Sequence, residues 1–183
     1  MKRAWILFAF GATGGVLLDA LHTFSATTLY TPPYLMRTAW WVPLLFTSAY
    51  GFGGLLYDRG WKSMRAPEAL APARDVALAM VLFAALYAAS GFLPFSNAIK
   101  TVILLVGAAG LWIFTDRTWQ GVLLSLSAAF GGPLAEVLLS RAGVFRHQHP
   151  DLLGIPIWLP ALYLATGPSF GQFARRVLNA RPS

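Results

Sequence analysis

Six stretches with few or no charged residues divide this chain of 183 residues, and each is about long enough to cross a lipid bilayer as a helix. The hydrocarbon core of a bilayer, ~30 Å thick, takes ~20 apolar residues of helix. The stretches lie at residues 4–21, 39–56, 76–93, 98–114, 119–139 and 154–171. They leave no room for a second domain. The sequence therefore predicts one all-α membrane domain over residues 1–183, a compact bundle of six transmembrane helices.

The composition agrees with a bilayer as solvent, because 57% of the residues are hydrophobic and only 11% are charged. A net charge of +7 alone is compatible with nucleic-acid binding, but the basic residues are scattered between apolar stretches and form no contiguous basic face. The absence of cysteine excludes disulfides, thiol catalysis and cysteine-ligated metal centres.

The charged residues of the loops predict which way the bundle faces. The third and fourth stretches are separated only by residues 94–97, and the fourth and fifth only by residues 115–118, so each pair is expected to be antiparallel. Counted over alternate loops, one side of the membrane carries ten lysines and arginines and the other carries Arg37, Arg141 and Arg146. The positive-inside rule then places both termini in the cytoplasm. Residues 172–183 are expected to form a basic cytoplasmic tail, either a short amphipathic helix on an anionic leaflet or an irregular segment.

Ionisable residues inside the stretches are the first candidates for a site, since each is costly in hydrocarbon unless it is paired. With the predicted orientation, Asp19, Lys100 and Glu136 fall at the same outer depth, and His22 lies on the same helix face as Asp19. Three readings remain open: an ion-pair network that fixes helix register, recognition of a headgroup or hydroxyl at a pocket mouth, and proton or ion transport.

Glycine and proline mark a second candidate region. Gly131, Gly132 and Pro133 fall in the fifth stretch, and Pro156, Pro160 and Gly167-Pro168 fall in the sixth. Small residues of this kind are most often packing positions between helices. The alternative is that lost helix hydrogen bonds splay the two helices, so that Gly132 and Pro133 line a lipid pocket.

Catalytic signatures are not found in the sequence. His147-Gln148-His149-Pro150-Asp151 is the single cluster of candidate metal ligands. His149 and Asp151 could bind a metal, but such an alternating pair in a short loop, without a third histidine or a cysteine, falls short of a catalytic site. Phosphate-binding glycine loops, HExxH and GxSxG are absent. We expect a protein without catalytic residues, resident metal or cofactor.

Several short motifs carry a family resemblance. Thr38-Ala39-Trp40-Trp41-Val42-Pro43, followed by Gly54-Leu55-Leu56-Tyr57, resembles the segment that opens the second span of the Insig (insulin-induced gene) family. Phe114-Thr115-Asp116-Arg117 resembles the Phe-Asp-Arg turn of that family. Gly143-Val144-Phe145, Pro150-Asp151-Leu152-Leu153 and Trp158-Leu159-Pro160 follow in the family's order. The resemblance covers residues 15 to 177 and is specific because the motifs occur in register on the same six-span plan.

The resemblance implies a non-catalytic membrane regulator that holds a lipid between its helices. Animal members bind oxysterols and retain the sterol-sensing proteins Scap and HMG-CoA reductase in the endoplasmic reticulum. The family's partner-binding aspartate maps onto Asp116, so Asp116 and Arg117 become candidate partner contacts, although an ordinary turn residue is the alternative at this position. The motif tryptophans Trp40 and Trp158 complete the candidate ligand-binding set.

This chain also departs from the animal proteins. It lacks their longer amino-terminal tail and their cysteines, and it carries Asp19 and His22 where they carry glutamine. Its short loops and its richness in alanine, arginine, glycine and proline are typical of a prokaryotic homologue. The expected ligand is therefore a sterol, a diacylglycerol-type lipid or an isoprenoid. The expected location is the bacterial plasma membrane if the source is prokaryotic and the endoplasmic reticulum membrane if it is eukaryotic, and a homo-oligomer is compatible with either. The alternative function is a small transporter or flippase for a lipid or hydrophobic solute.

Overall fold

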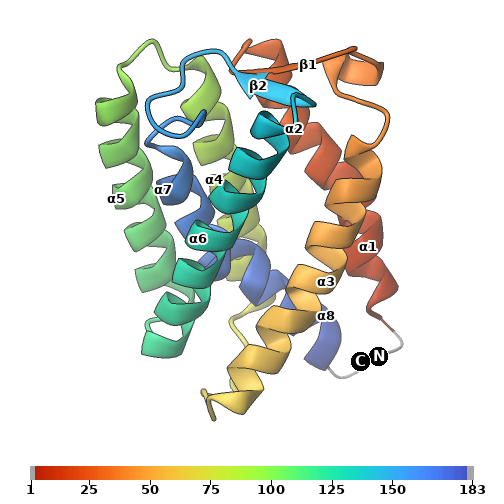
Figure 1. Ribbon diagram of the computed structural model, residues 1–183. Helices are drawn as coiled ribbons and strands as arrows, with labels where there is room; N and C mark the ends of the chain where they lie inside the picture. The colour runs from red at the N-terminus through yellow and green to blue at the C-terminus, as the bar shows by residue number, and fades with distance from the viewer. Residues whose placement is uncertain (1–2, 181–183) are drawn as a thin grey trace.

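The computed structural model describes residues 3–180, and it is a bundle of helices that run up and down beside one another (Figure 1). The first is a continuous helix made of α1 (Trp5–Phe10), the π-helical segment η1 (Gly11–Gly15) and α2 (Val16–Phe24). Four uninterrupted helices follow: α3 (Val42–Ser63), α4 (Ala73–Phe92), α5 (Asn97–Thr115) and α6 (Trp119–Arg141). The last is built from α7 (Leu159–Leu164), the π-helical segment η3 (Gly167–Gly171) and α8 (Gln172–Asn179). The predicted all-α bundle of six helices is confirmed.

The outer faces of the bundle are apolar. Four helices of the described chain are long and apolar enough to cross a membrane: residues 5–24, 73–92, 97–115 and 119–141. In the last three of these helices, only 22%, 17% and 17% of the residues in an apolar 18-residue segment are buried within the protein. Large side chains such as Val81, Val106 and Phe130 are at least 65% exposed. A surface of this kind needs lipid around it, so the protein is an integral, multi-pass membrane protein.

The last helix forms much of the core, and this differs from the prediction for its end. It begins at Leu159 rather than at residue 154 and continues through α8 to Asn179, where the sequence predicted a separate basic tail from residue 172. Ala165 and Ala174 are fully buried, and Arg175 is 4% exposed. Because α8 packs on α3, α4 and α1, it does not lie on a leaflet as a free amphipathic helix. The predicted tail residues 181–183, and Lys2 among the counted charges, lie outside the described residues.

One end of the bundle, which we call the strand end, is closed by a small sheet that the sequence did not predict. Strand β1 (Thr28–Tyr30) pairs antiparallel with β2 (Phe145–His147), with Leu29 opposite Arg146. The segment between β1 and α3 contains the 3₁₀ turn η2 (Leu35–Arg37). Thr23 Oγ1 donates a hydrogen bond of 2.8 Å to the carbonyl of Met36, so this connector is packed on the bundle.

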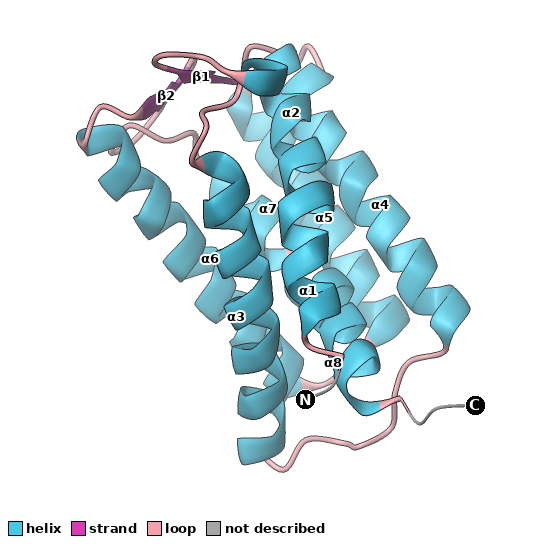
Figure 2. Ribbon diagram, turned by 90° about the vertical axis from the view of Figure 1, so that its right-hand side faces the viewer, coloured by secondary structure: helices cyan, strands magenta, loops and turns pink. Residues whose placement is uncertain are grey.

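The opposite end, the terminal end, carries both described ends of the chain (Figure 2). The guanidinium of Arg3 donates to the carbonyl of Ala180 over 3.3 Å. The α3–α4 connection also lies here, as does the turn between α5 and α6. An even number of crossings places both termini on one side, and the assignment of that side to the cytoplasm stays a prediction.

Candidate functional site

A cavity of ≈590 Å³, the central cavity, lies between α3 and α6 and is open on the side where Phe52 and Leu56 are exposed. The last helix and α4 form its inner wall, with Phe83, Leu159, Leu162 and Phe170. Its lining is predominantly hydrophobic and aromatic, which is typical of sites that bury a small apolar molecule.

Glu136 brings a polar group to the edge of this apolar cavity. Its Oε1 accepts a hydrogen bond of 2.7 Å from the Tyr163 hydroxyl, and its Oε2 lies 2.8 Å from Nε2 of His147. The carboxylate therefore joins α6 to α7 and to β2. Carboxylate oxygens have further acceptor capacity, so a ligand hydroxyl in the cavity has an acceptor within its lining.

The other ionisable residues of the predicted layer form two separate groups. His22 is 3% exposed, and its Nε2 lies 2.8 Å from the Ser90 hydroxyl while its ring stacks on Tyr87. Lys100 donates to the carbonyl of the same Ser90 over 2.8 Å. Asp19, also buried, accepts from the Tyr30 hydroxyl over 3.1 Å, and its second oxygen has no partner in the described part of the chain. The ion pairs found among the described residues do not include Lys100 or Asp19, so the four residues of this layer are not joined to one another in an ion-pair network.

The remaining predicted ligand-binding residues are dispersed. Gly132 lines the central cavity, and a side chain there would meet the ring of Tyr163, so the glycine lets α6 approach α7. Pro133 is buried inside α6, which continues past it to Arg141, and it does not line the central cavity. Trp158 is 1% exposed and donates to Asn97 Oδ1 over 3.1 Å at the strand end. Trp40 is 69% exposed just before α3 and does not line the central cavity.

Asp116 and Arg117 form the turn between α5 and α6 at the terminal end. Oδ1 of Asp116 accepts hydrogen bonds from the backbone N–H and the hydroxyl of Thr118, and the Thr118 hydroxyl in turn accepts from Gly121 N over 3.0 Å. These bonds cap the first turn of α6. Burial raises the pKa of the Asp116 carboxyl, and the Thr118 hydrogen bonds partly offset this effect. Arg117 is exposed and its backbone is left-handed, with φ of 58°.

Sequence reasoning missed the hydroxyl and imidazole groups that complete these networks. Tyr163, Tyr30 and Ser90 are uncharged, so a search for charged residues within spans passes over them. His147 was considered only as a metal ligand, whereas its ring bonds Glu136. Among the described residues no group of three or more potential metal ligands comes together.

The chain is similar in sequence to insulin-induced gene proteins of vertebrates. No family model matches the chain. Insulin-induced gene 1 protein of Cricetulus griseus is 28% identical over 187 residues, a match that covers the whole chain and 73% of that protein. Insulin-induced gene 2 protein of Gallus gallus is 29% identical, with 96% of this chain and 80% of that protein covered.

A solved structure has the same fold. The crystal structure of the mycobacterial Insig homolog MvINS from Mycobacterium vanbaalenii superposes with a TM-score of 0.85 at 23% identity, covering 100% of this chain and 97% of that one. A cross-linked trimer of MvINS gives a TM-score of 0.86. The chain is Insig-like. Both the vertebrate sequences and the mycobacterial fold match it over nearly its full length, as the sequence motifs indicated.

The Insig-like motifs lie at both ends of the bundle. Trp40 and Trp41 precede α3 at the strand end, where the Trp41 ring meets the ring of Tyr30 edge-on. Asp116 lies at the other end, in the α5–α6 turn. The motif that includes Trp158 opens the buried last helix, and the central cavity lies between these regions.

Proposed function

We propose that this protein is a non-catalytic, Insig-like membrane regulator that holds a neutral lipid in its central cavity. One observation carries the proposal: an apolar cavity of ≈590 Å³ that opens between α3 and α6 and has a carboxylate at its edge. Sterols, diacylglycerols and isoprenoid alcohols share the required chemistry, a long apolar body with one or two hydroxyl groups. The hydroxyl would donate to Glu136, and the apolar body would pack against Phe83, Leu162 and Phe170.

The direct test is lipid identification. Protein purified in a mild detergent should retain a neutral lipid in a fixed molar ratio, which mass spectrometry of the extracted complex measures. Lipid-free protein of normal stability would contradict the proposal. Movement of a lipid across reconstituted vesicles, lost on substitution of Asp19 or Glu136, would instead support a transporter.

Three glycines supply matched variants for the same test. Gly53 and Gly131 line the central cavity, and no atom lies within 4 Å of the position that a side chain would take at either. Gly110 in α5 is equally open but does not line this cavity. Leucine at any of the three should fit and should favour the helix by up to ~1 kcal/mol. Gly53→Leu and Gly131→Leu should reduce lipid retention because they fill the cavity, while Gly110→Leu should retain lipid as the unmodified protein does.

We further propose that the α5–α6 turn contacts a membrane partner protein. Arg117 is exposed, and the neighbouring Phe114 and Trp119 are 44% and 60% exposed, which gives the turn an apolar rim with one cation. Photo-crosslinking from Arg117 in native membranes tests this surface, with Arg146 at the strand end as the control position. Because MvINS has been crystallised as a cross-linked trimer, a second copy of this chain is among the partners to test, by light scattering in detergent.

A further inference from the structure

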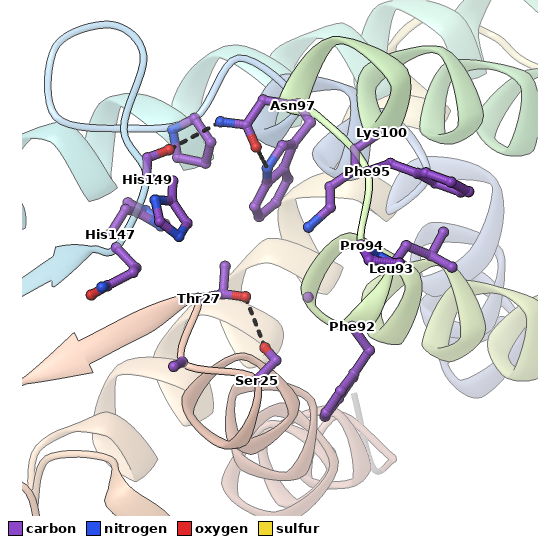
Figure 3. A pocket seen from close by; sticks show the side chains of 15 residues that line it. Ser25, Thr27, Phe92, Leu93, Pro94, Phe95, Asn97, Lys100, His147 and His149 are labelled. Atoms are coloured by element: carbon purple, nitrogen blue, oxygen red, sulfur yellow. Dashed lines mark hydrogen bonds between the residues drawn. The ribbon is translucent and has the colours of Figure 1, made fainter.

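A second cavity of ≈440 Å³, the outer cavity, lies at the strand end and differs in chemistry from the central one. It is enclosed by the end of α2, the α4–α5 turn, the segment after β2 and the start of the last helix (Figure 3). Its polar and charged lining residues are Ser25, Thr27, Asn97, Lys100, His147, Gln148 and His149. The central and outer cavities share no lining residue.

The lining of the outer cavity includes cationic and potentially cationic groups but no carboxylate. Lys100 and two histidines contribute to it, and neither aspartate nor glutamate does. Asp151 lies nearby, but its Oδ2 accepts from Asn97 Nδ2 over 2.7 Å and from Ile157 N over 2.9 Å. A carboxylate engaged in this way holds the loop in place and is not among the groups that line the cavity.

Lys100 has hydrogen-bonding capacity to spare. Its ammonium nitrogen donates to the carbonyl of Ser90, and no carboxylate lies within 4.0 Å of it in the described part of the chain. An ammonium has three N–H donors, so two remain. Figure 3 shows this nitrogen directed toward the middle of the space between the α4–α5 turn and the histidines.

His147 provides independent evidence for a binding site in this cavity. Its side chain is 1% exposed, Nε2 contacts Glu136, and Nδ1 is buried without a hydrogen-bond partner among the described residues. Leaving a buried polar atom unpaired costs ~1–3 kcal/mol, so such an atom in the wall of a polar cavity calls for a partner. With Nε2 donating to the carboxylate, Nδ1 accepts a proton donor when the ring is neutral and donates when it is protonated.

From these observations we propose that the outer cavity binds a phosphate group, with Lys100 as its cationic contact and Nδ1 of His147 as its buried hydrogen-bond partner. The phosphate belongs either to a phospholipid headgroup or to a soluble phosphate. A protonated phosphate oxygen would donate to neutral His147, and an ionised one would accept from the imidazolium. The hydroxyls of Ser25 and Thr27 lie in the same wall and supply further contacts.

Binding is tested on the full chain in a maltoside detergent by thermal unfolding at constant ionic strength. Three probes are added separately: inorganic phosphate against chloride, dioctanoyl phosphatidylglycerol, and dioctanoylglycerol, which lacks the phosphate. We expect the phosphate-bearing probes to raise the melting temperature with saturation. Lys100→Gln should weaken that binding about tenfold, because a hydrogen bond to a charged group is lost. The response to dioctanoylglycerol should not change, which separates this site from the central cavity.

Two further variants keep the test decisive. Arg146→Gln removes one cation from the same end of the molecule, on exposed β2 surface that does not line the cavity, and should bind as the unmodified protein does. His149→Ala removes an exposed lining ring that makes no side-chain hydrogen bond among the described residues, so it should fold normally and weaken binding by a smaller factor.

The results of these binding measurements decide whether the outer cavity is a phosphate site. Saturation by inorganic phosphate that depends on Lys100 supports the proposal with a soluble phosphate as ligand, and saturation by phosphatidylglycerol alone supports it with a headgroup. Equal binding by Lys100→Gln, Arg146→Gln and the unmodified protein would overturn it, as would the absence of saturable binding by either phosphate-bearing probe. Loss of dioctanoylglycerol binding alone would count against the proposed function of the central cavity and leave this proposal standing.

Discussion

Each end of the bundle holds a cation against backbone carbonyls, and the two cations differ in their surroundings. At the terminal end, Arg175 stacks on Trp61 with its guanidinium carbon 3.8 Å from the ring centroid. Its nitrogens donate to Gln172 Oε1 over 3.0 Å and to the carbonyls of Pro67 and Ala69 over 3.0 and 3.3 Å. At the strand end, Lys100 makes one bond to Ser90 and lines a cavity.

The difference separates a structural cation from one available to a ligand. The planar, five-donor guanidinium of Arg175 has several fixed partners and joins α8 to the α3–α4 connection. Arg176 contributes to the same joint by donating to the carbonyl of Ala71 over 2.8 Å. Lys100 is half-buried, has donors left over and faces space. The two cations therefore have different roles, which the number of their partners distinguishes.

Arg175→Leu should produce the largest loss of stability in the bundle. It removes the stacking on Trp61 and leaves several carbonyls of the α3–α4 connection unpaired, so the free energy of unfolding should fall by about 3 kcal/mol. Unfolding in mixed detergent micelles, followed by circular dichroism, measures it. Arg175→Lys should recover part of the loss, and Arg74→Gln, on a side chain that is 89% exposed, should have little effect. Equal losses at the two arginines would refute the structural role of Arg175.

The role of Arg175 also illustrates what the sequence could predict about the fold. Hydrophobic length alone located the helices, because a bilayer imposes that length on any crossing segment. The last span was predicted to end at residue 171 because the basic residues that follow, Arg175 and Arg176 among them, indicated a cytoplasmic tail, whereas the helix continues to Asn179. Both guanidinium groups donate to carbonyls of residues 67–71, more than 100 positions away in the chain. Such long-range partners leave no local signal.

For the candidate site, the sequence identified ionisable residues but not their grouping. Asp19, His22, Lys100 and Glu136 were expected in one layer, since depth follows from position along each span. The rotation of each helix decides which of them meet, and that depends on packing such as the close contact of Gly132 with Tyr163. The sheet that brings His147 to Glu136 joins strands more than a hundred residues apart and was not predictable from their three-residue lengths.

Glu136→Leu should have the next largest effect, and it tests whether the strand end also contains a structural charge. The Tyr163 hydroxyl and Nε2 of His147 would both lose their partner, which should lower the free energy of unfolding by about 2 kcal/mol. Glu136→Gln keeps an acceptor for Tyr163 and should cost less. The same unfolding titration measures both variants. If Glu136→Leu leaves the free energy of unfolding unchanged, the carboxylate has no structural role. Binding a ligand in the central cavity would then be its one proposed role.

Lys100→Gln should change stability by no more than about 1 kcal/mol, because a single hydrogen bond to Ser90 is altered and the side chain is only partly buried. The comparison with Arg175 predicts a contrast: a large loss of stability at the arginine, and at the lysine a small loss with a clear loss of phosphate binding. Arg146→Gln serves as the control for charge. A loss at Lys100 as large as that at Arg175 would make both cations structural and remove the distinction between the two ends.

The smallest expected effect concerns Asp116, the one acidic group of the α5–α6 turn. Burial raises its pKa in the folded protein, so folding favours the protonated carboxyl. Its contribution to stability is present below the ordinary carboxyl pKa of ~4 and is lost as the pH rises through the raised, folded-state pKa. In Asp116→Asn the amide oxygen still accepts from Thr118 but does not titrate. Unfolding measured across this pH range should therefore show the unmodified protein losing stability relative to Asp116→Asn as the pH rises. A difference that is constant with pH would mean that the turn carboxylate is as well solvated as an exposed one, and that Asp116 is open to a partner in the same way as Arg117.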